Sequence, residues 1–364
     1  MKIIIKKMLK KIRNLIEIIR FLFVKIPEND KQVALMFEIS KWKQPYMNVF
    51  LPEFNLVFVP KNINLVFLDS KIKKYSKVTF IVWGFNESTD IQTFALQKNI
   101  PLYRVEDGFL RSIGLGAMHN PPYSLCLDKK GMYFDSSKPS DLEDILNFYD
   151  FSKNAYLIHQ AKVLIKELTS KGISKYNHIN SIDIEKIYGK KKKNRILVIG
   201  QVEDDASIKK GADKPWTNND LVKLAYNENP NSQIIYKPHP DVLSRKRKMQ
   251  SNPEDIKHLA LIVNEPLSLS DSFKTIDHVY TITSLSGFEA LLRGIKVTTV
   301  GAPFYSGWSL TDDRQVVKRR NRKLTIEELF AGAYILYPRY ANPINGEKIN
   351  IEKTIELLSR SKEI

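Results

Sequence analysis

The stretch RILVIGQVEDDASI, which spans Arg195–Ile208, indicates most directly how this chain folds. Its apolar start predicts a buried parallel strand over Ile196–Ile199. A polar turn that contains the carboxylates Glu203, Asp204 and Asp205 follows that strand. A buried strand that ends in a polar turn is typical of open α/β sheets, in which ligands bind outside the carboxyl ends of the strands.

The same pattern recurs on both sides of this stretch. Apolar runs alternate with helical patterns in each half of the chain, which predicts an α/β, GT-B-like fold of two Rossmann-like domains facing a central cleft. The lysine run Lys190–Lys193 ahead of a fresh strand predicts a domain boundary, and a solvated turn is the alternative. The predicted strands are Val33–Phe37, Leu56–Val59, Asn64–Leu68, Thr79–Trp83, Leu102–Val105, Ile196–Ile199, Gln233–Tyr236, Leu261–Val263, His278–Thr281 and Lys296–Val300. The predicted parts are residues 1–27 (a basic amphipathic helix), 28–190 (the N-terminal domain with a helical connector), 191–335 (the C-terminal domain) and 336–364 (a helical segment).

The first 25 residues carry much of the excess positive charge. Lysine and arginine outnumber aspartate and glutamate by 57 to 40, and eight of the basic residues lie in this segment beside one acid, Glu17. On a helical wheel its apolar residues fall on one half, and its basic residues fall on the other half or at the edges. The segment is too charged to span a bilayer and lacks the features of a secretory signal. We expect an interfacial helix on an anionic membrane surface; the alternative is a helix that packs its apolar face on the protein.

The remaining composition narrows the class of protein. The single cysteine, Cys126, excludes an internal disulfide and agrees with a reducing compartment, so we expect a cytoplasmic body held peripherally on the inner membrane. The sequence contains no GxxxxGK[ST] loop, GxGxxG, HExxH or Cys/His framework, and therefore no metal site is expected. The basic residues do not belong to a recognisable nucleic-acid module, and no nucleic-acid partner is expected.

Two acidic clusters follow predicted strands. Glu106 and Asp107, with Arg111 close by, can supply a general base or hold a charged acceptor, and a surface turn is the alternative. The crowded carboxylates that end in Asp204 and Asp205 suit a nucleophile or an acid/base group. A helix N-cap cluster is the equal alternative for them, because acidic residues favour helix starts.

Two further clusters are suited to phosphate. In Lys237-Pro238-His239-Pro240 the prolines hold His239 in an extended turn, where its imidazole and Lys237 can donate to a phosphate oxygen. The segment that begins at Thr283 places hydroxyls and a glycine at a helix start, which favours anions, although an ordinary serine N-cap is the alternative. The residues predicted to bind the donor are Lys237, His239, Pro240, Ser284, Ser286, Gly287 and Glu289.

The loop Gly301–Arg314 is rich in glycine and aromatic residues. Aromatic rings beside paired acids suit a sugar face and its hydroxyls, and loop packing is the alternative. The residues predicted to bind the substrate are Arg111, Gln201, Tyr305, Trp308 and Asp312.

Eight blocks of sequence occur in the order in which one known family has them. They are EDGFLRSIGLG (Glu106–Gly116), SLCLDKKGMYFD (Ser124–Asp135), ISKYN (Ile173–Asn177), GQVEDDASI (Gly200–Ile208), KPHPDV (Lys237–Val242), TSLSGFEALLRG (Thr283–Gly294), GAPFYSGWSLTDDR (Gly301–Arg314) and YPRY (Tyr337–Tyr340). In these blocks the chain resembles the capsule polysaccharide synthesis/export family. Its characterised members are transferases of β-linked Kdo, 3-deoxy-D-manno-oct-2-ulosonic acid. The resemblance implies a GT-B fold, CMP-β-Kdo as donor, no further cofactor, and retention at the anomeric carbon.

The resemblance also implies roles for particular residues. His239 and the turn of Ser284 and Ser286 would hold CMP, with Glu289 on the ribose. Asp205 would be the nucleophile of a double displacement, with Asp204 in reserve. Glu106 and Asp107 would be the acid/base pair near the acceptor.

The acceptor stays open at this point. Family members build a poly-Kdo linker on lysophosphatidylglycerol, so the acceptor is lipid-linked or another glycan, and other capsule assembly proteins are candidate partners. Some members carry two such modules, whereas this chain carries one. The alternatives are a transferase for another CMP-linked acidic sugar, such as a sialic acid, and a non-catalytic capsule-assembly subunit.

Overall fold

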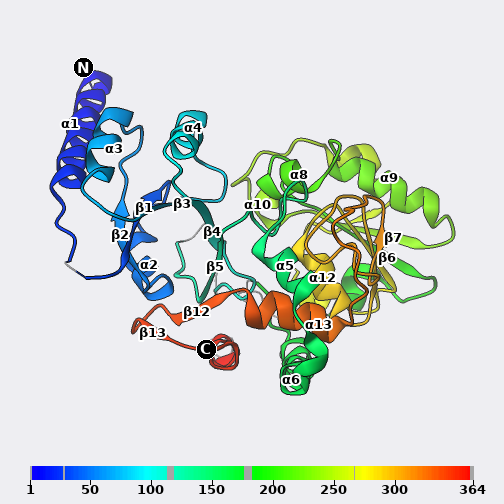
Figure 1. Ribbon diagram of the computed structural model, residues 1–364. Helices are drawn as coiled ribbons and strands as arrows, with labels where there is room; N and C mark the ends of the chain where they lie inside the picture. Colours follow the sequence, from blue (N-terminus) through cyan, green and yellow to red (C-terminus); the bar gives the residue numbers. More distant parts are fainter. Residues whose placement is uncertain (1, 28, 113–118, 176–182, 266, 361–364) are drawn as a thin grey trace. The chain divides into compact units, whose positions relative to one another are not determined.

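The computed structural model describes residues 2–27, 29–112, 119–175, 183–265 and 267–360 (Figure 1). By its internal contacts the chain forms two compact units. Unit 1 comprises Met1–Gly108, Pro121–Lys129 and Arg339–Asn350, and unit 2 comprises Phe109–Asn120, Lys130–Pro338 and Ile351–Ile364. Each unit is described by itself. The predicted α/β class is confirmed, because each unit contains a β-sheet together with helices.

Unit 1 contains a seven-stranded sheet of order β13-β12-β5-β4-β3-β1-β2. The four strands β1 to β4 run parallel, and β5, β12 and β13 are added in antiparallel fashion. The strands are β1 Gln32–Phe37, β2 Phe54–Phe58, β3 Val78–Trp83, β4 Leu102–Asp107, β5 Ser124–Asp128, β12 Arg339–Asn342 and β13 Glu347–Lys348. The helices are α1 Lys2–Phe23, α2 Gln44–Phe50, α3 Leu65–Ile72 and α4 Thr89–Gln97.

Alternation along the strands divides the core of unit 1 between the two faces of its sheet. Ala34, Ile81 and Val105 pack on one face with Met47 and Phe50 of α2. The other face packs on α1, α3 and α4. Its contacts involve Leu35, Phe80 and Val82 of the sheet with Phe21, Leu68 and Phe94 of the helices.

One predicted strand of unit 1 was wrong. Asn64–Leu68, predicted as a strand, is the start of α3, because the Asn64 side chain accepts a hydrogen bond from Val66 N (2.8 Å) and caps a helix there. A short apolar run cannot distinguish a strand from a buried helix. The segment 336–364 was predicted to be helical with an interruption at Tyr337–Pro343; it contributes β12 and β13 to this sheet and α14 to unit 2.

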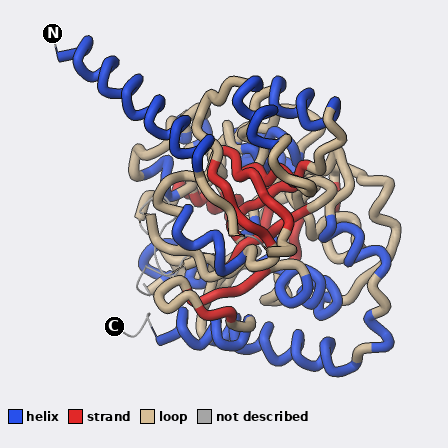
Figure 2. Tube along the Cα trace, turned by 60° about the vertical axis from the view of Figure 1, so that its left-hand side comes forward, coloured by secondary structure: helices blue, strands red, loops and turns tan. Residues whose placement is uncertain are grey.

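Helix α1 is held to unit 1 at its C-terminal end. Phe21 is buried in the core, and the ammonium of Lys71 in α3 donates to the carbonyls of Leu22 (3.3 Å) and Val24 (3.0 Å). Glu17 forms an ion pair with Lys41. Figure 1 shows α1 beside α3, and Figure 2 shows the first turns of α1 projecting away from the strands.

The apolar stripe of α1 faces outward. The exposed apolar residues with described side chains are Leu9, Ile12, Leu15, Ile16, Ile19 and Phe23. On the helical wheel Phe21, which enters the core, lies opposite this stripe. The part of the stripe whose side chains are described therefore does not pack on the protein, which was the alternative considered from sequence. Among the described residues, no helix has the length and apolar content needed to cross a membrane.

Unit 2 is built on a six-stranded parallel sheet of order β11-β10-β9-β6-β7-β8. Read from β8, this is the 3-2-1-4-5-6 order of a doubly wound Rossmann sheet, with its switch point between β6 and β9. The strands are β6 Arg195–Ile199, β7 Gln233–Lys237, β8 Leu261–Ile262, β9 His278–Thr281, β10 Lys296–Thr299 and β11 Asp312–Asp313. The α-helices connected with this sheet are α8 Ala206–Gly211, α9 Asn218–Glu228, α10 Pro240–Leu243, α11 Leu269–Ser272 and α12 Leu285–Leu291.

A second group of helices completes unit 2. Its α-helices are α5 Asp141–Phe148, α6 Ala155–Ser170, α7 Ile184–Tyr188, α13 Ile326–Phe330 and α14 Ile351–Arg360. The π-helix Ala331–Leu336 continues α13, and short 3-10 helices occur at Phe151–Lys153 and Pro253–Ile256. The boundary predicted at Lys190 lies inside unit 2, because α6 packs on α13 and the π-helix rather than on the first sheet.

An aromatic core joins distant segments of unit 2. The ring of Phe109 lies 4.8 Å from that of Phe304 and 5.2 Å from that of Tyr334. Phe288 of α12 lies 5.2 Å from Phe304 and 5.4 Å from Tyr334. The Gly301–Arg314 loop is thereby fixed to α12 and to the π-helix.

Glu143 should be a major contributor to the stability of unit 2. This buried carboxylate accepts hydrogen bonds from Arg319 (2.6 Å) and from the buried Arg320 (3.0 Å). Glu143→Ala would leave the guanidinium of Arg320 without its counter-charge, so we expect a loss of about 3 kcal/mol or more of unfolding free energy in urea denaturation. The matched control is Glu254→Ala, which breaks an exposed pair with Lys257 and should change stability by under about 1 kcal/mol. Equal losses in both variants would contradict this prediction.

Candidate functional site

Gln201 joins the two strand ends at the switch point of unit 2. Thr283 N donates to Gln201 Oε1 (2.8 Å), and Gln201 Nε2 donates to Thr283 Oγ1 (3.1 Å). The main chain of Gln201 exchanges two bonds of 2.9 Å with the amide of Asn218 at the start of α9. The Gln201 side chain, predicted to bind substrate, is thus engaged in connecting β6 to β9.

The ends of β6 and β7 approach each other as closely as their backbones allow. A Cβ on Gly200 would lie 2.9 Å from the Tyr236 hydroxyl and 3.0 Å from Pro238 Cα. Gly200 N donates to Lys237 O (2.8 Å). The GQVEDDASI and KPHPDV blocks are therefore neighbours in space, as ligand residues at one edge of a parallel sheet should be.

The three successive carboxylates bind to different partners. Glu203 accepts from Asn218 N (2.7 Å) and Ser251 N (2.9 Å) and so ties the loop before Ser251 to the start of α9. Asp204 pairs with Arg247 (2.6 Å), whose hydrogen bond lowers the pKa of that carboxyl. Asp205 caps α8 by accepting from Ser207 N (2.8 Å). The helix-cap alternative thus describes Asp205, and capping holds its carboxylate in one orientation beside the sheet edge.

His239 is arranged as a hydrogen-bond donor. Its Nδ1 accepts from Asp241 N (3.1 Å), so the proton of the neutral ring is on Nε2. Burial lowers the pKa of His239, and the carboxylates of Asp241 and Asp205 partly oppose that shift. The charge of Asp205 thus acts on this imidazole. Pro240 occupies the first turn of α10, which His239 caps.

Lys237 carries a charge that is nearly withdrawn from water. Its exposed fraction is 9%. Burial lowers the pKa of Lys237 to about 8, and its charge also acts on His239. A buried ammonium beside an imidazole donor is an arrangement that an anionic ligand would stabilise.

A hydrogen bond from Tyr305 holds the turn at the start of α12. Ser284 caps the helix by accepting from Ser286 N (3.1 Å), and the Tyr305 hydroxyl donates to Ser284 O (2.5 Å). Gly287 allows this contact, because a Cβ there would lie 2.2 Å from that hydroxyl. Tyr305 is fully buried and supports the predicted phosphate turn instead of facing a sugar.

Three other predicted substrate residues, and the predicted donor residue Glu289, also form bonds within the protein. Trp308 is fully buried and its indole donates to Phe304 O (2.8 Å), so loop packing, the alternative, applies to it. Arg111 is buried and donates to Ser112 Oγ (2.7 Å). Asp312 lies on the edge strand β11, where it pairs with Arg314 (2.8 Å). Glu289 is buried and accepts from Lys175 N (3.3 Å), which connects α12 with the ISKYN block.

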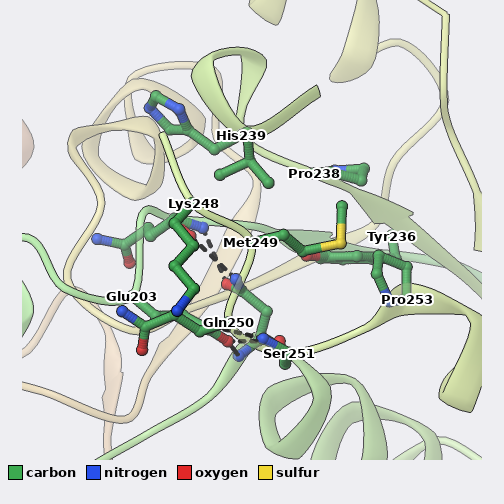
Figure 3. A pocket seen from close by; sticks show the side chains of 12 residues that line it. Glu203, Tyr236, Pro238, His239, Lys248, Met249, Gln250, Ser251 and Pro253 are labelled. Carbon is green, nitrogen blue, oxygen red and sulfur yellow. Dashed lines mark hydrogen bonds between the residues drawn. The ribbon is translucent and has the colours of Figure 1, made fainter. Parts of the chain in front are cut away.

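A small open pocket lies beside these groups in unit 2 (Figure 3). Glu203, Tyr236, Pro238, His239 and Lys248 are among the residues that line it. Figure 3 shows the bonds of Glu203 to Ser251 on one side, with the His239 imidazole on the far side from them. Within the described part of the chain, no group of three or more His, Cys, Asp or Glu side chains is placed to hold a metal ion.

In unit 1 the structure separates Glu106 from Asp107. Successive strand residues face opposite sides of a sheet, and Asp107 shares the α2 face with Val105. There it accepts from the ammonium of Lys43 (3.0 Å), which also lies 3.3 Å from the centroid of the Trp83 ring. On the other face, an oxygen of Glu106 lies 2.7 Å from where a Cβ of Gly84 would be. Lys43 was not among the residues predicted from the sequence. The available signal was its position just before Pro45 at the start of α2, where a helix-capping residue is expected.

Parts of two sequence blocks are outside the described residues. They are Ile113–Gly116 of the EDGFLRSIGLG block and Tyr176–Asn177 of the ISKYN block. The described ends of both blocks meet in unit 2, where Ser112 N donates to Lys175 O (3.5 Å).

Comparison with known proteins agrees with this α/β architecture. The family described as "Capsule polysaccharide biosynthesis protein" matches residues 79–347. The lipopolysaccharide-processing protein LpsZ of Rhizobium meliloti is 44% identical over 332 residues, which are 91% of this chain and 75% of LpsZ. The chain belongs to the capsule polysaccharide biosynthesis protein family, and the resemblance inferred from its sequence blocks is confirmed.

Further relatives extend this comparison. The capsule polysaccharide modification protein LipA of Neisseria meningitidis serogroup B is 40% identical over 96% of this chain, which spans about half (49%) of LipA. The β-Kdo 2,4 transferase of Thermosulfurimonas dismutans KpsC has a TM-score of 0.78 at 33% identity, covering 91% of this chain and 99% of that one. The β-Kdo 2,7 transferase of KpsC has a TM-score of 0.73 at 34% identity, covering 91% and 100%.

The buried charge of Lys237 should make stability depend on pH. A lysine whose pKa falls from 10.5 to about 8 on folding contributes stability above pH 10.5 that is lost as the pH falls through 8. Lys237→Met removes a cost of about 3 kcal/mol at neutral pH, so we expect it to exceed the wild type in unfolding free energy at pH 7. The difference should shrink by pH 9.5.

Urea denaturation of both proteins at the two pH values measures this effect. Lys223→Met, which replaces an exposed lysine of α9, is the control. A difference between Lys237→Met and the wild type that does not change with pH would contradict the prediction.

Proposed function

We propose that this protein is a retaining glycosyltransferase that moves Kdo from CMP-β-Kdo to a lipid-linked or glycan acceptor in capsule polysaccharide biosynthesis. The observation that carries the proposal is the similarity to two Kdo transferase structures at 33% and 34% identity, over 91% of this chain and nearly all of each of them. Because nearly all of each transferase structure is aligned, the similarity extends beyond one shared domain. The proposal includes the GT-B arrangement of two Rossmann-like domains.

The binding site for the sugar donor CMP-β-Kdo is assigned to the carboxyl edge of the sheet in unit 2. The Nε2–H of His239 and the ammonium of Lys237 are the donors for the CMP phosphate, and their positions at the end of β7 support that role. The hydroxyl of Ser286 in the turn at the start of α12 is a further donor, and Glu289 is assigned to the ribose. A phosphate held by these groups leaves as the sugar is transferred, and its developing charge is stabilised there.

Asp205 is assigned as the nucleophile. Its carboxylate attacks the anomeric carbon of Kdo, the bond to the phosphate breaks, and CMP departs with the electron pair. The acceptor hydroxyl then attacks the same carbon, loses its proton to a general base, and releases Asp205. Two inversions give retention. Asp204 suits the role less well, because its carboxylate is already paired with Arg247.

Replacing the nucleophile tests this assignment. Asp205→Asn keeps a helix-capping oxygen but removes the attacking carboxylate, so we expect transfer from CMP-Kdo to fall by about 10³-fold or more. Asp204→Asn is the matched control and should retain activity within about tenfold. Mass spectrometry of the product formed on a synthetic lysophosphatidylglycerol acceptor is the measurement. The reverse order of losses would assign Asp204 instead, and transfer from CMP-sialic acid alone would reject the Kdo donor.

The same proposal places the protein peripherally on the inner membrane. Helix α1 directs its apolar stripe away from unit 1, and its sequence carries basic residues beside that stripe. In interfacial binding, apolar side chains insert below the lipid headgroups, while lysines lie at the depth of the anionic headgroups and are attracted to them. Such an anchor would keep the active site near a lipid-linked acceptor.

The exposed stripe of α1 can be tested without deleting the helix. Leu15→Ser with Ile19→Ser removes two inserted side chains, so we expect binding to phosphatidylglycerol vesicles to weaken by at least about tenfold. Phe148→Ser, at another exposed apolar residue, should leave vesicle binding unchanged. Co-sedimentation that is undiminished in the double variant would refute the membrane assignment.

A further inference from the structure

The sheet of unit 1 has its own switch point. β1 is flanked by β2 on one side and by β3 on the other, so the chain leaves β1 in one direction and returns on its opposite side. In open α/β sheets the carboxyl ends at such a point form a binding crevice. Three residues come from the segments that leave adjacent strands there: Lys43 follows β1, Trp83 ends β3 and Asp107 ends β4.

These three side chains form one contact group on the α2 face. The Lys43 ammonium lies 3.0 Å from Asp107 Oδ1 and 3.3 Å from the centroid of the Trp83 ring. The side chains of Lys43 and Asp107 are only 9% and 17% exposed. A charged hydrogen bond at this depth fixes a carboxylate more firmly than a surface ion pair does.

A lysine at position 43 is unfavourable for the start of helix α2. It occupies the N-cap position of α2, makes no capping bond with its side chain, and precedes Pro45 in the first turn. A lysine cannot accept a bond from the free N–H groups of a helix start, and its charge is unfavourable at the positive end of the helix dipole. Residues that break a local rule are expected at functional sites.

We propose that Lys43 is a positioning residue that acts through Asp107 in the acceptor half of the reaction. This inference rests on the proposed function. In that half the acceptor hydroxyl gives its proton to the Asp107 carboxylate while its oxygen bonds to the anomeric carbon. The bond from that carbon to its leaving group breaks, and the leaving group departs with the electron pair. Lys43 holds the plane of Asp107 for this transfer, and Glu106, on the other face of β4, is outside its reach.

The two halves of a double displacement can be measured separately. Without acceptor, the first half releases up to one equivalent of CMP per enzyme in a rapid burst; with acceptor, steady-state transfer reports both halves. For Lys43→Met we expect the burst to stay within about twofold of the wild type and transfer to fall by about 100-fold. Lys43→Arg keeps the cation and should recover transfer to within about tenfold.

Arg104→Met is the matched control. Arg104 also forms a buried ion pair over an aromatic ring of unit 1, with Glu87 (2.7 Å) and Phe85 (3.8 Å), but on the other face of β4. Its loss should leave the ratio of transfer to burst unchanged. The same ratio change in Arg104→Met would show that unit 1 has merely been destabilised, and the inference would be overturned.

Other outcomes are equally decisive. Full transfer in Lys43→Met, or loss of the burst together with transfer, overturns the role of Lys43 while leaving the proposed function intact. Absence of CMP release by the wild type from any CMP-sugar overturns both. Should Lys43→Met fail to fold by circular dichroism, Lys43→Gln takes its place: a fall in transfer with an unchanged burst supports positioning by the cation, and full transfer or a loss of the burst overturns it.

Discussion

The carboxyl ends of β6, β7 and β9 in unit 2 are crowded together, and the candidate donor residues depend on that crowding. Gly200 has no room for a side chain against β7, and Thr283 lies against two further glycines, Gly211 and Gly301, where a Cβ would come within 2.9 and 2.7 Å of its methyl group. The amide of Gln201 then joins Thr283 to β6. Larger residues at these points would separate the strands and with them His239, Asp205 and the turn before α12.

Much of this architecture could be predicted from the sequence because it depends on local periodicity. The strand β6, the polar turn after it and the amphipathic α1 are visible in the pattern of apolar residues alone. The strands β12 and β13 could not be predicted, because both are short. The place of β12 in the sheet is set by pairing with β5, more than 200 residues away, and β13 pairs with β12. Asn64, as a helix-capping residue, could have indicated α3, but the apolar run after it favoured a strand instead.

The candidate site was predictable in its residue types and less so in its geometry. His239 and Asp205 come close because β6 and β7 are neighbours, which strand order implies. Burial is a property of the whole fold, so the sequence of the Gly301–Arg314 loop could not decide between a sugar contact and the burial observed for Tyr305 and Trp308. The opposite orientation of Glu106 and Asp107 follows from strand alternation, once Val105 is known to face α2.

The chain passes from one unit to the other five times, at residues 108/109, 120/121, 129/130, 338/339 and 350/351. Neither unit is therefore a continuous piece of the gene. A truncation after Pro338 would remove β12 and β13 from one sheet and α14 from the other unit in a single cut. Fragments that begin or end inside this chain should be poor expression targets, and recombination can duplicate or fuse such a module only by carrying it whole.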